Sequence, residues 1–318
     1  MSDRVRVVVA GAGAVGSVVG GLLAARGHHV LLVGRDPHMA AVARAGLHVT
    51  GLFGDRRSAP RCATDLERAD GPADVIFVSV KSHATAEVVS VLARWRNLPP
   101  LVVSLQNGLG NVETLAAALG VQRVLGARVI FGALVPEPGR AHVTVNARPV
   151  AIGPLREDEA LRSHAERVAA LFADAGIPAE ALASVEALLW EKALYNCGLN
   201  PLGALHGLTY GEVVASPKLR PVLDAAIDEG FAVARACGIS LPGGDAASFR
   251  DYFHATLVPP TAAHRSSMRQ DLEAGRRTEV DAIGGAIVRA GAQAGIATPV
   301  NAGLVAAIHD AERARRDG

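Results

Sequence analysis

The chain has 318 residues; half of them are hydrophobic, and 32 Lys and Arg balance 31 Asp and Glu. This length exceeds the size at which a single hydrophobic core usually stops growing, so two domains are expected. Because neither charge sign forms a long run, the sequence argues against a nucleic-acid partner. Its three scattered cysteines and dispersed histidines lack the spacings of a disulfide framework or a metal site, so we expect no metal and a reducing cytoplasm.

Strands and helices alternate along the N-terminal half of the chain. Short, apolar, β-branched runs predict strands, and longer runs that end near glycine predict helices. The predicted strands are residues 4–10, 28–34, 75–80 and 101–105, and the predicted helices are residues 14–26, 85–94 and 112–119. Such alternation is typical of a parallel sheet covered on both faces, so we expect an α/β fold with a Rossmann-type doubly wound sheet.

One segment of this half also has the hydropathy of a membrane element. Residues 7–25 carry no charge, and they hold Gly16 and Gly20 at the spacing of transmembrane helix dimers. Hydropathy alone would identify a membrane span or a signal sequence here. The interrupting glycines and the β-branched start favour a strand followed by a helix, so we expect no membrane partner.

After residue 123 the pattern turns to strand-like runs at 124–131, 142–146 and 150–152, which we expect to add antiparallel strands at one edge of the sheet. A helix is predicted at 157–175, closed by glycine and proline.

Beyond about Ser184 the pattern is entirely helical. Interruptions of these helices are predicted at Pro201, Ser216, residues 238–244 and Pro259. We therefore expect a dinucleotide-binding domain over residues 1–183 and an all-helical, substrate-binding and catalytic domain over residues 184–318.

A glycine fingerprint lies where the first predicted strand meets the first predicted helix. It reads Gly11-Ala12-Gly13-Ala14-Val15-Gly16. Gly11 permits a tight turn, Gly13 lets backbone N–H groups approach a pyrophosphate, and Gly16 allows the helix to pack against the strand. The helix N-terminus would then hold the phosphates of a dinucleotide. The alternative is that these glycines serve close packing only.

The second predicted strand ends at Gly34-Arg35-Asp36, near the place where NAD enzymes carry an acidic residue against the ribose hydroxyls. A guanidinium there can bind the additional phosphate of NADP in bidentate fashion, whereas a carboxylate would repel it. The order of Arg35 and Asp36 favours NADPH as cofactor, and Asp36 keeps a strict preference for NADP over NAD open. The alternative for Arg35 is an ordinary solvated loop residue.

Two polar residues follow apolar strands at their carboxyl ends, where ligands bind in open α/β sheets. Lys81 follows the strand at 75–80, and Asn107 follows the strand at 101–105. Lys81 could equally be a solvated strand end, and Asn107-Gly108 could equally be turn chemistry, since Asn-Gly suits positive φ.

The segment from Trp190 to Pro201 places Lys192, Asn196 and Asn200 one helical turn apart, with apolar residues on either side. We expect this stripe to face a polar site, because a surface face would carry more charge and a core face would carry none. A lysine in a partly dry cleft suits proton donation during carbonyl reduction. The alternative is a snorkelling lysine beside capping asparagines.

Two later segments add polar candidates. Ser267 lies at the start of a predicted helix, and Glu279 borders the apolar stripe of Ile283 and Ile287, so Glu279 is expected to point toward the space between the domains. The alternatives are a helix cap for Ser267 and a surface ion pair with Arg276 for Glu279.

Together these residues resemble the ketopantoate reductase family over almost the whole chain. The combination is specific, although the glycine fingerprint alone is not. The motifs, in family order, are the Gly11 fingerprint, Val80-Lys81, Gln106-Asn107-Gly108-Leu109-Gly110, Trp190-Glu191-Lys192, Asn196-Cys197, Asn200-Pro201, Ser266-Ser267-Met268 and Arg277-Thr278-Glu279-Val280-Asp281.

The resemblance implies NADPH-dependent reduction of 2-dehydropantoate (ketopantoate) to (R)-pantoate in pantothenate biosynthesis. It implies that Lys192 is the general acid toward the keto oxygen and that Glu279 hydrogen-bonds or orients the substrate. In the same way it gives Lys81 a place against substrate or cofactor and Arg35 the NADP phosphate. The residues implied to position substrate and nicotinamide are Asn107, Asn196, Asn200 and Ser267.

Two other functions stay open. The first is an NAD(P)-dependent reductase of another small branched 2-oxo acid, or a hydroxy-acid dehydrogenase, because fold and catalytic lysine would be shared. The second is a non-catalytic NADP-binding regulator, against which the retained Lys192, Asn196 and Glu279 argue, since a pure binder needs no proton donor. The apolar helical domain is also compatible with a homodimer.

Overall fold

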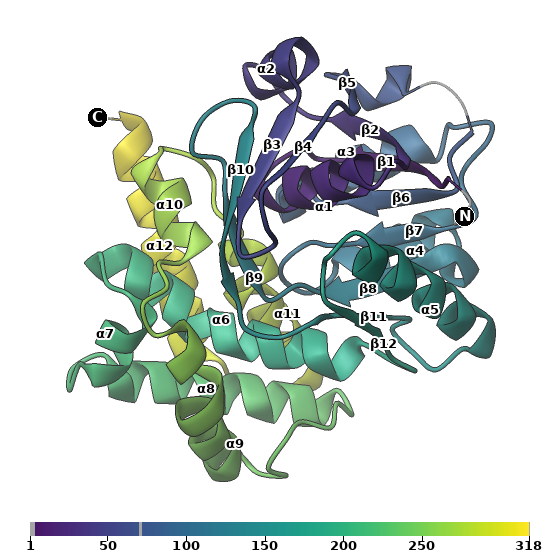
Figure 1. Cartoon of the computed structure of the whole chain (residues 1–318). Helices are drawn as coiled ribbons and strands as arrows, with labels where there is room; N and C mark the ends of the chain where they lie inside the picture. Colours follow the sequence, from purple (N-terminus) through teal and green to yellow (C-terminus); the bar gives the residue numbers. More distant parts are fainter. Residues whose placement is uncertain (1–3, 70–71, 318) are drawn as a thin grey trace. The chain divides into compact units, whose positions relative to one another are not determined.

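The computed structural model describes residues 4–69 and 72–317, and its chain forms two compact units (Figure 1). The first unit comprises Met1–Gln106 and Asn111–Glu186. The second comprises Ala187–Gly318 together with the short stretch Asn107–Gly110. The first unit is α/β and the second is helical in its described residues, as the alternation of sequence patterns predicts.

An eight-stranded sheet forms the core of the first unit, in the order β12-β11-β8-β7-β6-β1-β2-β5. All neighbouring strands run parallel except β8 and β11. The central strands are apolar and buried, because helices cover both faces of a parallel sheet. The strands are β1 (Arg6–Ala10), β2 (His29–Val33), β5 (Arg61–Ala63), β6 (Val75–Val78), β7 (Val102–Ser104), β8 (Val124–Arg128), β11 (Val150–Gly153) and β12 (Ala179–Ala181).

The predicted doubly wound sheet is confirmed. The strand order reverses between β1 and β6, since β2 pairs with one edge of β1 and β6 with the other. The helices of this unit are α1 (Ala14–Ala25), α2 (His38–Ala45), α3 (Thr85–Leu92), α4 (Asn111–Leu119) and α5 (Glu159–Asp174). Such a reversal creates a crevice at the carboxyl ends of the two strands, where ligands bind in folds of this kind.

A second, four-stranded sheet in the order β4-β3-β10-β9 packs on the other side of α1. Its strands are β3 (Leu47–Gly51), β4 (Arg56–Ser58), β9 (Phe131–Leu134) and β10 (Arg140–Asn146). An added Cβ on Gly20 would lie 2.3 Å from Leu32 of β2, and one on Gly21 would lie 2.6 Å from Val49 of β3. The helix is therefore enclosed between two sheets, which explains why it is apolar on all sides.

This enclosure also accounts for the membrane-like hydropathy of residues 7–25, which are divided between β1 and α1. Within residues 4–69 and 72–317, no helix is both long and apolar enough to cross a bilayer.

The prediction that the strands after residue 123 all join one edge of the main sheet is wrong in part. β11 does pair antiparallel with β8. The run at 124–131, however, breaks into β8 and β9, and β9 pairs with β10 in the second sheet. Residues 140–143 pair in parallel with 48–51, a partner about ninety positions away that local periodicity does not reveal.

The second unit is a bundle of helices around one apolar core, and its described residues include no strand. Its α-helices are α6 (Glu186–His206), α7 (Tyr210–Ala215), α8 (Arg220–Ala236), α9 (Ala246–Tyr252), α10 (Ser267–Glu273), α11 (Gly284–Ala294) and α12 (Pro299–Asp317). Glu229 of α8 joins two of them, because its carboxylate accepts from the backbone N–H of Val300 at 2.7 Å and of Asn301 at 2.9 Å at the start of α12.

The predicted interruption at Pro201 is wrong. α6 continues through Pro201 to His206, and only one backbone hydrogen bond is lost, because proline has no N–H to donate to the carbonyl of Cys197. The residues around Pro201 are buried on every side, so tertiary packing outweighs the local penalty. The predicted break at Ser216 is confirmed, since α7 ends at Ala215.

Candidate active site

The glycine turn between β1 and α1 has the geometry that its spacing predicts. Gly11 has φ +111°, and an added Cβ would lie 2.4 Å from the backbone N of Val80. The N–H groups of Gly11 and Ala12 both donate to the carbonyl of Val33, which ties the turn to the end of β2. An added Cβ on Gly16 would lie 2.1 Å from the carbonyl oxygen of Gly11. A side chain therefore does not fit at Gly11 or at Gly16.

Gly13 differs from the other two, because a Cβ at this position would meet nothing within 4 Å. Gly13 is exposed and forms the N-cap of α1, and it provides no side-chain cap for the first amides of the helix. These amides lack intrahelical acceptors and carry the positive end of the helix dipole. The first turn of α1 therefore fits the pyrophosphate of a dinucleotide.

Ser79, which directly follows β6, contacts this turn and was missed by the sequence patterns. Its hydroxyl donates to the carbonyl of Gly11 at 2.7 Å, and its backbone N–H donates to the carbonyl of Ala10 at 2.8 Å. It thus fixes the strand end that precedes Lys81 to the glycine turn. A polar residue directly after the apolar run of β6 was the available signal.

At the end of β2, Arg35 is exposed and Asp36 has a local structural role. The carboxylate of Asp36 accepts from the backbone N–H of Ala40 at 2.9 Å at the start of α2. Next to them, the ring of His38 lies 3.0 Å from the hydroxyl of Ser17 and accepts from the N–H of Gly139 at 3.1 Å. Burial lowers the pKa of His38, so the ring is neutral at neutral pH and adds no charge beside Arg35.

Asn107 and Gly108 follow β7 in the chain and belong to the second unit. Gly108 has φ +87°, and an added Cβ would lie 2.4 Å from the carbonyl oxygen of Ala282. Leu109 donates to the same carbonyl at 2.8 Å. Gly108 thus allows both the turn and the close approach to Ala282.

Lys192 on α6 contacts Asn107 directly. Its ammonium donates to Oδ1 of Asn107 at 2.5 Å, and its side chain is half-buried. The structure therefore brings together two candidates that were predicted from segments 85 residues apart. The sequence contains only three lysines, Lys81, Lys192 and Lys218, among its 32 basic residues. Retaining lysine at 192 in an arginine-rich chain is a further signal of a specific role.

The two asparagines that follow Lys192 on α6 are buried. Asn196 is 6% exposed and Asn200 is 3% exposed. Oδ1 of Asn200 accepts from the hydroxyl of Tyr210 at 2.6 Å, which fixes its amide orientation. The predicted polar stripe of α6 therefore faces inward within the second unit rather than bulk water.

Two other titratable groups on α6, Tyr195 and Cys197, are poorly suited to proton transfer at neutral pH. Burial raises the pKa of Tyr195 to about 12, although a hydrogen bond with Thr261 partly opposes this shift. Burial, together with the nearby charge of Glu229, raises the pKa of Cys197 to about 12. Acids this weak are poor donors near pH 7, so neither Tyr195 nor Cys197 is a candidate for the proton donor.

Ser267 and Glu279 lie at the starts of two short helices. Ser266, and not Ser267, caps α10, because its hydroxyl accepts from the N–H of Arg269 at 3.1 Å. Glu279 is only 8% exposed. Arg276, which could have formed a surface pair with Glu279, donates to Asp271 at 3.0 Å. The surface ion pair between Arg276 and Glu279 is therefore not formed, and Glu279 is a buried carboxylate.

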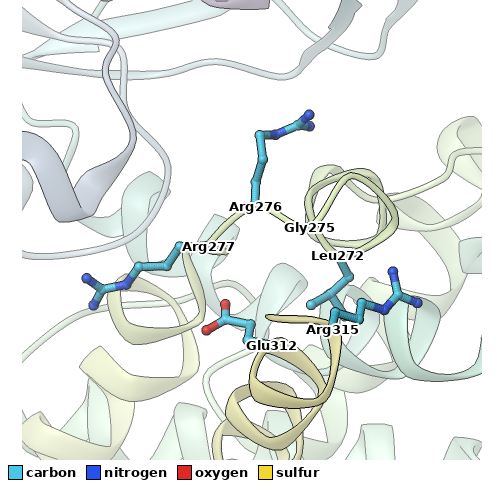
Figure 2. Close-up of a pocket in the computed structure, with 6 residues that line it drawn as sticks. All are labelled: Leu272, Gly275, Arg276, Arg277, Glu312 and Arg315. Carbon is cyan, nitrogen blue, oxygen red and sulfur yellow. The ribbon is translucent and has the colours of Figure 1, made fainter. Parts of the chain in front are cut away.

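Figure 2 shows a small pocket close to Glu279 in sequence. It is lined by Leu272, Gly275, Arg276, Arg277, Glu312 and Arg315. The guanidinium groups point in different directions in Figure 2, and Arg276 and Arg277 form ion pairs with Asp271 and Asp281. These side chains do not converge on one point as the donors of a phosphate site would.

Family models match both parts of the chain. "Ketopantoate reductase PanE/ApbA" matches residues 7–157, and "Ketopantoate reductase PanE/ApbA C terminal" matches residues 184–312. The 2-dehydropantoate 2-reductase of Archaeoglobus fulgidus is 38% identical, with 96% of this chain and 98% of that protein covered. This chain belongs to the ketopantoate reductase family.

Solved structures agree with this assignment. The PanE/ApbA family ketopantoate reductase from Ralstonia eutropha JMP134 is 33% identical and has a TM-score of 0.85, with 98% of this chain and 99% of that chain covered. The fold is shared more widely, since a D-mandelate dehydrogenase solved with NADH has a TM-score of 0.87 at 22% identity, with 98% of this chain and 99% of that chain covered. Fold alone therefore does not choose the substrate of a ketopantoate reductase family member.

Proposed function

We propose that this protein reduces 2-dehydropantoate to (R)-pantoate with NADPH, in pantothenate biosynthesis. The observation that carries the proposal is the hydrogen bond between the Lys192 ammonium and Asn107 in a member of the ketopantoate reductase family. A half-buried ammonium that is held by a neutral amide can donate a proton to a carbonyl oxygen. The glycine turn of the first unit supports the dinucleotide cofactor.

In this proposal residues 1–183 form the dinucleotide-binding domain and residues 184–318 the substrate-binding and catalytic domain. When bound, NADPH supplies the hydride that adds to the keto carbon. Lys192 gives its proton to the keto oxygen as negative charge develops there, and Asn107 keeps the ammonium in place. Lys81 faces substrate or cofactor at the end of β6.

The remaining proposed contacts belong to the second unit. Glu279 orients the substrate by accepting a hydrogen bond from its hydroxyl group. The side chains of Asn196, Asn200 and Ser267 complete the substrate site. Their burial or half-burial supports this role, because water-excluded hydrogen bonds are stronger and more directional than exposed ones.

The cofactor is held by the turn Gly11-Ala12-Gly13-Ala14-Val15-Gly16 and by Arg35. The bond between Asp36 and Ala40 supports NADPH over NADH, because it gives that carboxylate a role in starting α2 rather than in binding ribose. Three free cysteines support a reducing compartment, which we propose to be the cytoplasm. A homodimer is the proposed assembly, and light scattering during size-exclusion chromatography tests it.

The direct test is a spectrophotometric assay of NADPH and NADH oxidation with 2-dehydropantoate and a panel of small 2-oxo acids. We expect turnover with 2-dehydropantoate and NADPH to have the highest kcat/KM. A higher kcat/KM for another branched 2-oxo acid would replace the proposed substrate but keep the reaction type. NADPH binding without turnover of any 2-oxo acid would instead indicate a non-catalytic regulator.

Replacing Arg35 by Ala is expected to raise the KM for NADPH about tenfold, because a charge-assisted bond to the additional phosphate is lost. The KM for NADH should change less than twofold, since NADH lacks that phosphate. Arg235→Ala, at an exposed arginine on α8, is the matched control. Equal effects of Arg35→Ala on the two cofactors would contradict the assignment.

Replacing Glu279 by Ala is expected to lower kcat/KM for the 2-oxo acid about tenfold or more, because a buried hydrogen-bond acceptor for the substrate is removed. Glu279→Gln should keep part of the activity, since its amide oxygen still accepts. The exposed Glu157→Gln serves as control. A Glu279→Ala protein with unchanged kcat/KM would exclude Glu279 from substrate binding.

A further inference from the structure

A chain of buried polar side chains links the two strand ends that carry Lys81 and Asn107. Gln106, only 6% exposed, donates from Nε2 to the carbonyl of Val80 at 3.0 Å and to the hydroxyl of Thr85 at 2.7 Å. Thr85 donates to Oδ1 of Asn111 at 2.9 Å. Asn111 in turn donates from Nδ2 to the hydroxyl of Ser82 at 3.2 Å. These hydrogen-bonded side chains thus contact the residues on both sides of Lys81.

One backbone carbonyl determines which group donates and which accepts in every hydrogen bond of this network. The carbonyl of Val80 can only accept, so the amide nitrogen of Gln106 must face it and the amide oxygen must face Ser104. The second N–H of Gln106 then points to Thr85, whose hydroxyl must use its own proton on Asn111. Asn111 is thereby oriented with its nitrogen toward Ser82. One arrangement satisfies the whole network, which makes it rigid.

The network acts on both sides of the proposed site. Val80 and Ser82 flank Lys81, and Gln106 directly precedes Asn107, the residue that accepts from Lys192. The same strand end is also held at Ser79, whose hydroxyl donates to Gly11 of the glycine turn. A shift of Gln106 therefore displaces the segment that bears Lys81 and the residue that holds the Lys192 ammonium.

We infer that Gln106, Thr85 and Asn111 are positioning residues that fix Lys81 and Asn107 for cofactor binding and carbonyl reduction. This inference rests on the proposed function for the roles of Lys81 and Asn107. Gln106 is the first residue of the motif Gln106-Asn107-Gly108-Leu109-Gly110, but the proposed reaction uses no group of its side chain. Its buried amide is explained by the bonds that it makes to the neighbouring strand end.

The test compares Thr85→Val, which keeps the shape of the side chain and removes the hydroxyl, with Thr85→Ser, which keeps the hydroxyl. Thr85→Val leaves a donor of Gln106 and the acceptor of Asn111 without their partner. We expect its dissociation constant for NADPH, measured by protein fluorescence, to rise about tenfold, while Thr85→Ser stays within about twofold of the wild type. Thr298→Val, at a buried threonine near α12, is the control for loss of a buried hydroxyl.

Two further measurements separate positioning from general destabilisation. Amide hydrogen exchange in the peptide covering residues 79–84 should be faster in Thr85→Val than in the wild type, with exchange in β1 unchanged. In a Lys81→Met background, Thr85→Val should raise the NADPH dissociation constant by less than about a further twofold. The reason is that Thr85 can no longer act through the Lys81 ammonium once that group has been removed. Full additivity of the two substitutions would show that Thr85 does not act through Lys81.

A milder variant covers the case in which Thr85→Val does not fold. Ser104→Ala removes the donor to Oε1 of Gln106 at the far end of the network, where little volume is lost. We expect a rise of about threefold in the NADPH dissociation constant and faster exchange at 79–84. Unchanged affinity and unchanged exchange in Ser104→Ala, and in Thr85→Val where it folds, would overturn the inference.

These readouts do not depend on the identity of the 2-oxo acid. If the wild type binds NADPH but does not reduce 2-dehydropantoate, the proposed function fails while affinity and exchange still decide the inference. If the wild type turns over 2-dehydropantoate and the network variants bind NADPH and exchange like the wild type, the inference fails and the proposed function stands.

Discussion

Lys192→Ala is expected to lower kcat for 2-dehydropantoate by roughly two to four orders of magnitude, because the forming alkoxide loses its proton donor. The affinity for NADPH should stay within about twofold, since Lys192 belongs to the helical unit and its bond is to Asn107. The measurement is kcat at saturating substrate, with NADPH affinity determined separately by fluorescence.

Lys218→Ala is the matched control for this experiment, because Lys218 is the remaining lysine outside the site and is exposed. It should leave kcat unchanged. Asn107→Ala is expected to reproduce part of the loss, since Lys192 would then lose the amide oxygen that holds its ammonium, and the double substitution should be little worse than Lys192→Ala alone. A loss below tenfold for Lys192→Ala at saturating substrate would refute the role of general acid.

Gly13→Ala is expected to raise the dissociation constant for NADPH about tenfold to one hundredfold, because the added methyl group blocks charge-assisted hydrogen bonds between the backbone and a phosphate. Tm should stay unchanged, because the methyl group contacts no other atom of the protein. The structure separates these effects, since a Cβ at Gly13 meets no atom within 4 Å. Fluorescence titration gives the affinity, and thermal unfolding gives Tm.

Gly16→Ala should behave differently, because its Cβ would lie 2.1 Å from the carbonyl oxygen of Gly11. We expect it to lower Tm as well as NADPH affinity. Gly303→Ala is the control for Gly13→Ala, since Gly303 lies within α12 and a Cβ there also meets nothing within 4 Å. Gly13→Ala with wild-type affinity for NADPH would mean that the pyrophosphate does not approach this turn.

The local features of the site could be predicted because they depend on short stretches of sequence. The glycine spacing around Gly11 encodes a tight turn and the start of a helix, and the one-turn spacing of Lys192, Asn196 and Asn200 encodes one face of a helix. Ser79 and the network around Gln106 could not be predicted in the same way, because their partners are distant in sequence and hydroxyl and amide groups are common in any loop.

By itself, the sequence determined the alternation of strands and helices, the glycine turn, and the face of α6 that carries Lys192, because backbone preference and side-chain period act over a few residues. The tertiary structure decided what lies against those elements. Burial between two sheets makes α1 a core helix although its hydropathy resembles a membrane span, and packing carries α6 through Pro201. The contact of Lys192 with Asn107 was likewise decided by tertiary structure, since long-range packing selects which distant segments meet and local periodicity carries no such information.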